Sequence, residues 1–122
     1  MSIALTESSF WILSSLAAGR RHGYGILQDV AALSDGVTKL KVPTLYAALE
    51  RLEQAGLVAE DGEEVVDGRA RRYYLLTDAG THALDAEAAR LAERARIAQA
   101  RLAARARPAR APRPATAQAG PA

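Results

Sequence analysis

Lysine and arginine residues flank a short leucine-rich segment in the middle of the chain, in positions suited to binding phosphate. Lys39 and Lys41, the only lysines, directly precede the segment 43–56, and Arg69 and Arg71 follow it. Lysine binds phosphate as a compact charge, whereas arginine donates paired hydrogen bonds to phosphate or guanine. These residue types therefore suit non-covalent recognition of a polyanion, with solvated loop lysines as the alternative for Lys39 and Lys41.

The segment 43–56 has the spacing of an amphipathic helix. Its leucines recur at helical intervals, and Thr44, Tyr46, Ala47 and Arg51 lie outside that apolar stripe. Such a helix fits the major groove of B-DNA, about 12 Å wide, where threonine contacts thymine and arginine pairs with guanine. We therefore expect these four residues to contact DNA. The alternative is an ordinary surface helix in which Arg51 pairs with a nearby glutamate.

A β-hairpin is predicted further along the chain, with Asp67-Gly68 as its turn. Strand alternation places Arg69 and Arg71 on one face and Arg72 on the other. Arg69, beside the turn, is expected to contact the minor groove or the phosphate backbone. For Arg71 and Arg72, cross-strand ion pairs are as well supported as DNA contact; the acidic candidates are Glu60, Asp61, Glu63 and Glu64.

His22 and Tyr24 open another predicted helix. Helix N-termini attract anions, so the Tyr24 hydroxyl is a further candidate for phosphate binding. The alternative is that Tyr24 packs against the segment 43–56 and that His22 only turns the chain. His22 and His82 are the only histidines, and two isolated histidines are poor evidence for a metal ion, so no metal site is predicted.

The composition argues against several classes of protein. The chain has no cysteine, so disulfides, thiolate metal sites and cysteine nucleophiles are not expected. It also has no glycine-rich phosphate loop and no serine–histidine or paired-carboxylate arrangement, so neither an enzyme nor a cofactor is expected. No run of apolar residues reaches the length of a membrane span, and the first residues do not resemble a secretory signal. A cytoplasmic protein without membrane contact is predicted.

The net charge of +2 hides an uneven distribution. Residues 1–93 contain nine basic and fourteen acidic side chains, a net charge of −5, whereas residues 94–122 contain seven arginines and no acid. A body of this charge repels phosphate as a whole, so any DNA contact must come from local placement of lysine and arginine. Glu50 and Glu53, within the segment 43–56, are expected to point along its rim and pair with arginines. The alternative for Glu50 is that it lies in the major groove and accepts a hydrogen bond from cytosine.

The elements that must position these residues are three short helices, two strands and a long helix. Thr6 and Thr77 are placed to cap the first and the last helix, and Gly56 is placed to end the third. Near residue 57 the apolar period changes from about 3.6 to about 2, which marks the strands. After the first helix, which follows Thr6, the predicted ranges are 24–33, 43–56, 57–59, 72–76 and 78–105.

This order predicts a mainly α protein with a small two-stranded β-wing. Residues 1–77 would form a winged helix-turn-helix DNA-binding domain, followed by a C-terminal dimerisation helix at 78–105. Residues 106–122, rich in proline, alanine and arginine, would be a disordered basic tail. The tail would add phosphate affinity or simply increase solubility, and we favour the second.

Three stretches of the chain resemble the PadR family of transcriptional regulators. They are His22–Ile26, then Pro43–Tyr46 running on through Leu49, Arg51-Leu52 and Gly56-Leu57, then Arg71–Thr77 with Ala79-Gly80. The resemblance covers roughly residues 8 to 90. It implies a dimer whose winged heads enter neighbouring major grooves of double-stranded DNA and whose C-terminal helices pair. It also implies repression, in some members released by small effectors, although no feature of this sequence supports an effector.

The last predicted helix carries a narrow apolar seam. Leucines and alanines from Leu84 to Leu102 follow the 4-3 spacing of a coiled coil. Because so few of them are large, a homodimer is expected to use Phe10 and Trp11 of the first helix as well. The alternative for these two aromatic residues is that they line an effector pocket. The predicted dimer contacts are Phe10, Trp11, Leu84, Leu91 and Leu102.

Together these observations predict a homodimeric repressor that binds specific double-stranded DNA sequences. The alternative is a winged-helix protein–protein interaction module without specific DNA binding, which the negative charge of residues 1–93 favours.

Overall fold

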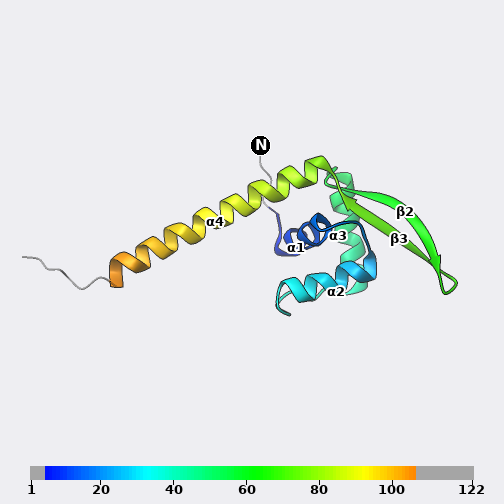
Figure 1. The fold of residues 1–122 in the computed structure, drawn as a ribbon, viewed down its shortest axis with the longest axis horizontal. Helices are drawn as coiled ribbons and strands as arrows, with labels where there is room; N and C mark the ends of the chain where they lie inside the picture. The colour runs from blue at the N-terminus through cyan, green and yellow to red at the C-terminus, as the bar shows by residue number, and fades with distance from the viewer. Residues whose placement is uncertain (1–4, 107–122) are drawn as a thin grey trace, which may run out of the picture. The chain divides into compact units, whose positions relative to one another are not determined.

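The computed structural model describes residues 5–106. Within them are four helices and a small antiparallel sheet whose strands lie in the order β1-β3-β2 (Figure 1). The predicted winged helix-turn-helix fold is therefore confirmed, with one strand more than expected. In chain order the elements are α1 (Glu7–Ala17), β1 (Arg21–His22), α2 (Gly23–Leu33), α3 (Val42–Gln54), β2 (Val58–Val66), β3 (Arg69–Leu76) and α4 (Asp78–Ala106).

The chain divides into two compact units, one ending at Ala88 and the other beginning at Ala89. We call residues 5–88 the head. It holds α1, α2, α3, the sheet and the first turns of α4. Strands β2 and β3, which we call the wing, project from the three short helices (Figure 1).

The additional strand β1 contains only two residues. Arg21 pairs with Tyr74 and His22 with Tyr73, so β1 continues the sheet on the free side of β3. Two residues are too few to show a period-2 pattern, which is why the sequence predicted only a turn here. The pairing ties the turn after α1 to the base of the wing.

Side-chain caps define the helix ends where the sequence predicted them. The Oγ1 atom of Thr6 accepts a hydrogen bond from the Ser9 N–H at 3.0 Å, and Thr77 Oγ1 accepts one from the Gly80 N–H at 3.0 Å. At the end of α3, Gly56 has φ +78° and the next N–H, of Leu57, bonds to the Leu52 carbonyl. These three predictions are confirmed.

The wing turns at Asp67-Gly68, as predicted. Both residues have positive φ, 51° and 75°, as in the two-residue turn that matches the twist of a hairpin. The strands extend well beyond the predicted 57–59 and 72–76. Residues 60–66 are mainly polar on both sides of the ribbon, so they show no alternation of apolar and polar residues.

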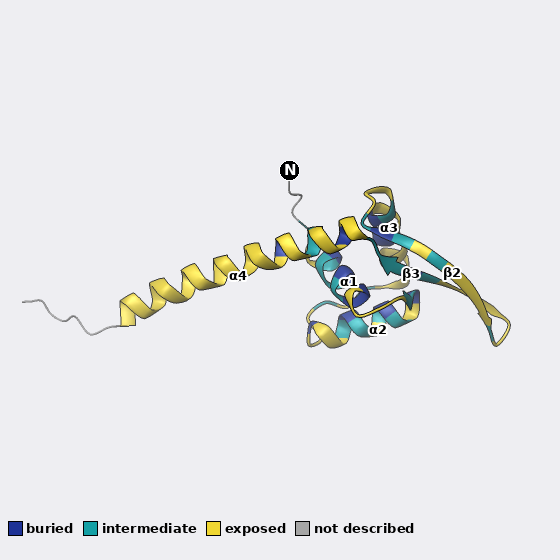
Figure 2. Cartoon of the chain, turned by 45° about the horizontal axis from the view of Figure 1, so that its top comes forward, coloured by how far each residue is buried: buried dark blue, intermediate teal, exposed yellow. Residues whose placement is uncertain are grey.

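The core lies between the helices and the base of the sheet (Figure 2). From α3 it takes Leu45, Ala48, Leu49 and Leu52, so the stripe predicted to be apolar is the buried side of that helix. Tyr74 is the only one of the two adjacent wing tyrosines that is fully buried. The other buried apolar residues described are Ile12, Leu13, Leu16, Ile26, Val30 and Val58.

The start of α4 packs closely against the end of α3. Thr77 Oγ1 donates to the Gly56 carbonyl at 2.6 Å, and the Thr77 N–H donates to the Leu57 carbonyl at 3.2 Å. A Cβ atom added at Gly80 would collide with the Leu57 carbonyl oxygen and lie 2.7 Å from Leu76 Cδ1. Only glycine therefore fits here without displacing the backbone.

Beyond the head, every described residue from 89 to 106 is exposed (Figure 2). These residues include Leu91, Ile97 and Leu102, which are 38%, 45% and 60% exposed. Helix α4 ends one residue past the predicted 105, and the rest of the predicted tail, 107–122, lies outside the described residues. None of the helices described is both long and apolar enough to cross a membrane.

One core residue carries a testable energetic cost. Ser15 is fully buried in α1, and its hydroxyl has no hydrogen-bond partner among the described residues. Burial of an unpaired hydroxyl is unfavourable, and alanine is also the better helix former. Ser15→Ala is therefore expected to raise the free energy of unfolding by about 1 kcal/mol in urea titrations.

The neighbouring serine provides the control for this prediction. Ser14 Oγ donates to the Phe10 carbonyl at 2.8 Å, so Ser14→Ala removes a satisfied group and should change the free energy of unfolding much less. A destabilised Ser15→Ala variant would show that the hydroxyl makes a stabilising contact.

Candidate nucleic-acid interface

The side of α3 away from the core is exposed to solvent. Thr44, Ala47 and Arg51 are exposed, and Tyr46 is 41% exposed. Thr44, Ala47 and Arg51 face solvent and Tyr46 lies partly over α2, so the structure leaves this side of α3 available as a recognition helix. Their contact with DNA stays a prediction.

An open groove of about 700 Å³ lies between the start of α2, the first turns of α3 and the wing. Four of the residues predicted to bind DNA line it together: Tyr24 and Tyr46 on the helical side, Arg69 and Arg71 on the wing. The remaining lining residues described are His22, Gly23, Val66, Asp67, Ala70 and Arg72.

Tyr24 and Tyr46 present their rings at this groove for different reasons. Tyr24 is 63% exposed, so most of its side chain is open to solvent at the groove, and whether it binds phosphate or packs against the segment 43–56 stays a prediction. Tyr46 lies over the start of α2, where a Cβ on Gly23 would collide with its hydroxyl and lie 2.9 Å from its Cζ. Gly23 therefore determines where the Tyr46 ring can lie, a role that the sequence did not reveal.

His22 caps α2. Its Nδ1 accepts a hydrogen bond from the Gly25 N–H at 3.2 Å, and its ring meets Tyr73 edge-on at a centroid distance of 5.5 Å. Burial lowers the pKa of His22, the positive charge of Arg71 lowers it further, and Glu64 opposes the shift. The expectation that His22 turns the chain is confirmed, and a neutral ring suits its role as hydrogen-bond acceptor.

The cap predicts a pH dependence of stability. Unfolded His22 has its ordinary pKa of about 6.5, so the unfolded chain binds the proton more readily than the folded chain does. The contribution of His22 is thus complete above that pH and is lost as the pH falls through the lower folded pKa. His22→Asn keeps a capping acceptor without titrating, so its free energy of unfolding should fall less between pH 7.5 and 5.5. Equal falls in the two proteins would contradict this.

The three wing arginines have different surroundings. Arg72 Nε lies 3.7 Å from Glu60 Oε1 and 4.0 Å from Glu63 Oε2, so cross-strand pairing is confirmed for Arg72. Neither Arg69 nor Arg71 forms an ion pair within residues 5–106. Arg69 and Arg71 are therefore not held in ion pairs beside the groove, although Glu64 lies opposite Arg71 in the ladder.

The two lysines lie in the loop between α2 and α3. Lys39 and Lys41 are exposed, and in the described part of the chain neither is ion-paired. Lys41 is the N-cap residue that precedes α3, and its side chain makes no capping hydrogen bond. Both are therefore available to a phosphate beside α3.

Acidic residues gather at the C-terminal end of α3 and the base of the wing. Burial raises the pKa of Glu53, and repulsion from Glu60 raises it further. Arg72 lies among these carboxylates and lowers the pKa of Glu53 in part. This end of α3 would repel phosphate, so the first turns of α3 and the groove are better suited to a duplex.

Residues 12–86 match the model of the transcriptional regulator PadR-like family. The match spans more than half of the chain. The protein belongs to the PadR-like family. The resemblance that the sequence motifs indicated is confirmed.

Individual PadR-like relatives agree with this assignment. Over 82 residues the chain is 41% identical to Transcriptional regulator Rv3488 of Mycobacterium tuberculosis, with 67% of this chain and 73% of that protein aligned. A PadR family transcription regulator of Clostridium difficile superposes with a TM-score of 0.67 at 26% identity, over 80% of this chain and 99% of the other.

A further structure shares the fold with DNA present. It is Bacillus subtilis PadR in complex with operator DNA, which superposes with a TM-score of 0.56 at 23% identity. The superposition covers 63% of this chain and 44% of that protein. At this identity the likeness establishes the shared fold.

Proposed function

We propose that this PadR-like protein binds specific sequences in double-stranded DNA as a homodimer and represses transcription. The observation that carries the proposal is the uncovered polar side of α3 beside a groove lined by two tyrosines and by two arginines without ion pairs in residues 5–106. Local charge of this kind attracts a duplex even though residues 1–93 are negative overall.

The arrangement suggests how a duplex is bound. Helix α3 enters the major groove, with Thr44, Ala47 and Arg51 at the base edges. The adjacent phosphate strand then lies along the groove of the head, where tyrosine hydroxyls and arginines donate hydrogen bonds. The Asp67-Gly68 turn places Arg69 at the phosphate backbone beside the neighbouring minor groove. Bacillus subtilis PadR, which has the same fold, forms a complex with operator DNA, which supports DNA binding by this fold.

The proposed dimer joins two heads through α4. Leu91 and Leu102 are exposed apolar side chains on the predicted seam, whereas Trp11 and Leu84 are partly buried against the core of the head. Phe10, edge-on to Trp11 at 5.2 Å, is half-buried. Two heads would read half-sites about 34–36 Å apart, or a multiple of this distance. A dimer bound at a promoter would exclude RNA polymerase and would therefore repress transcription.

The oligomeric state is tested by sedimentation. Wild type is expected to sediment as a dimer, and Leu91→Glu/Leu102→Glu as a monomer with a folded head, because charges in the seam cannot be buried unpaired. A monomeric wild type at micromolar concentration would contradict the dimer.

Specific binding is tested by fluorescence anisotropy over a salt series. DNA taken from beside the gene of this protein is expected to bind more tightly than a random duplex of equal length. Affinity for both should fall with salt, because each neutralised phosphate releases counterions. Equal affinity for the two duplexes at every salt concentration would contradict sequence-specific binding.

The second candidate function is a protein–protein interaction module. The net charge of −5 over residues 1–93 favours it. The triple substitution Lys39→Ala/Lys41→Ala/Arg69→Ala separates the two functions. DNA affinity that is unchanged by the removal of these three charges would support the interaction module, and a steep fall in affinity would support the DNA-binding regulator.

A further inference from the structure

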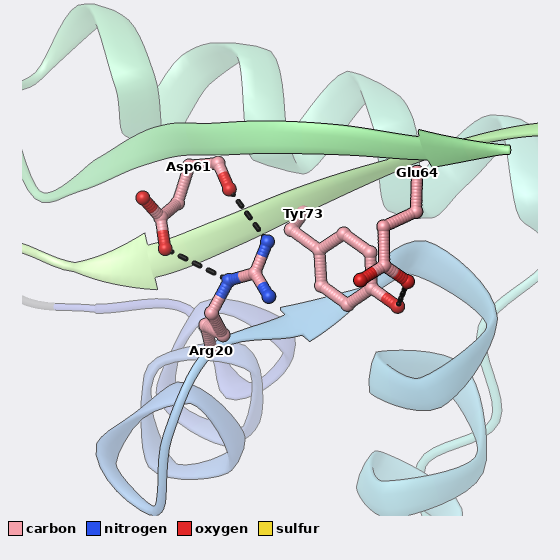
Figure 3. A network of polar contacts seen from close by, with 4 residues as sticks. All are labelled: Arg20, Asp61, Glu64 and Tyr73. Carbon is pink, nitrogen blue, oxygen red and sulfur yellow. Dashed lines mark hydrogen bonds and ion pairs between the residues drawn. The ribbon is translucent and has the colours of Figure 1, made fainter.

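Arg20 links the helical part of the head to the wing (Figure 3). It lies in the turn between α1 and β1, which is also tied into the sheet through the pairing of β1 with β3. Its Nε lies 2.8 Å from Asp61 Oδ2, and its Nη2 donates to the Asp61 carbonyl oxygen at 2.8 Å. One side chain of the helical body therefore holds both the side chain and the backbone of a wing residue.

The residue held by Arg20 lies in a β-bulge. Glu60 pairs with Tyr74 and Glu63 with Arg72, so Asp61 and Gly62 together oppose Tyr73. Gly62 has φ +88°, a conformation that glycine adopts readily. A bulge bends a strand and disrupts the ladder locally, and Arg20 supplies a donor to the carbonyl there.

Arg20 also packs on the opposite strand. Its guanidinium carbon lies 3.9 Å from the centre of the Tyr73 ring, within the range of a cation–π contact. The hydroxyl of the same tyrosine donates to Glu64 Oε1 at 2.8 Å, on the tip side of the bulge (Figure 3). Arg20 is thus in contact with both strands at the point where the wing projects from the three short helices.

These contacts are suited to setting the direction of the wing rather than to stabilising the fold. The side chains of Arg20 and Asp61 are each 42% exposed, and ion pairs that exposed contribute little to global stability. A two-stranded ribbon is marginally stable by itself, so a small bias at its base can change the orientations that it populates. Arg69 and Arg71 lie beyond the bulge, so any change there moves them relative to α3.

We propose that Arg20 is a positioning residue that holds the wing at its bulge so that Arg69 and Arg71 face the groove beside α3. The proposal rests on the proposed function, because the consequence of a misdirected wing is weaker DNA binding. It assigns to Arg20 a role through Asp61 and Tyr73, without contact to DNA.

Removal of Asp61 separates this role from simple electrostatics. Asp61→Ala removes a negative charge, so charge alone would tighten DNA binding, whereas release of the wing from Arg20 should weaken it. We expect Asp61→Ala and Arg20→Met each to weaken binding about fivefold, and the double variant to be no weaker than either, since both break the same ion pair. Glu63→Ala, on the same strand with the same charge change, should bind as wild type or more tightly.

A second measurement does not need DNA. NMR order parameters of wing amides at residues 63–72 should fall in Asp61→Ala and Arg20→Met, while those of α1–α3 and the melting temperature stay close to wild type. Unchanged order parameters, or unchanged or tighter DNA binding by Asp61→Ala, would overturn the proposal. If wild type bound no DNA, the proposed function would fail, and the order parameters alone would decide whether Arg20 restrains the wing.

Discussion

Arg69→Ala/Arg71→Ala is expected to weaken DNA binding roughly 100-fold, about tenfold for the removal of each charge-assisted hydrogen bond to phosphate. Both side chains line the groove, and neither has an ion-pair partner within residues 5–106. Their removal should weaken binding to specific and random duplexes alike, because phosphate contacts carry no sequence information. The slope of log affinity against log salt concentration should become shallower by about 1.8 for each head.

The adjacent arginine is the matched control. Arg72 lies on the same strand, but Glu60 and Glu63 already compensate its charge. Arg72→Ala should weaken DNA binding less than about threefold, an estimate that follows from the small contribution of exposed pairs. If Arg72→Ala weakened binding as much as the double variant, the distinction between paired and unpaired wing arginines would be wrong.

Gly80→Ala is expected to lower the free energy of unfolding by about 3 kcal/mol, as for an overpacked core. The new Cβ would meet the Leu57 carbonyl, which is backbone and already accepts from the Thr77 N–H. In an exposed helix, replacement of glycine by alanine would raise the free energy of unfolding by about 1 kcal/mol. At Gly80 the close approach of the Leu57 carbonyl reverses the sign of this effect. Thermal and urea unfolding, followed by circular dichroism, measure the effect.

Gly25→Ala is the control for this substitution. Gly25 also lies in the first turns of a helix, but a Cβ there would come no closer than 3.7 Å to another atom. This variant should be as stable as wild type, or more stable by about 0.5–1 kcal/mol. If Gly80→Ala were as stable as wild type, α4 would have to move away from the Leu57 carbonyl with no loss of free energy of unfolding, and the prediction would be wrong.

Local side-chain chemistry made much of the fold predictable. Thr6 and Thr77 cap helices through atoms three residues away, and Gly56 ends α3 through its own backbone conformation. The turn at Asp67-Gly68 is likewise a property of two adjacent residues. Features whose cause and effect lie within one turn of chain leave a pattern in the sequence.

The parts that escaped prediction depend on contacts between distant segments. Gly23 lies against Tyr46 and Gly80 against Leu57, and neither neighbour is implied by sequence spacing. Arg20 looked like one more surface arginine, because its partner Asp61 is 41 residues away. The groove residues were predicted individually, whereas their meeting in one place follows from the packing of the wing against the helices.

The tight turn at Asp67-Gly68 limits how the hairpin can change length during evolution. One residue inserted into each strand at the wing base would keep the turn but move every side chain beyond the insertion to the opposite face of the ribbon. Two inserted residues per strand would restore the original facing. Homologous hairpins that keep arginines directed at the same side should therefore differ in steps of about four residues, and an intermediate length should coincide with the gain or loss of a bulge.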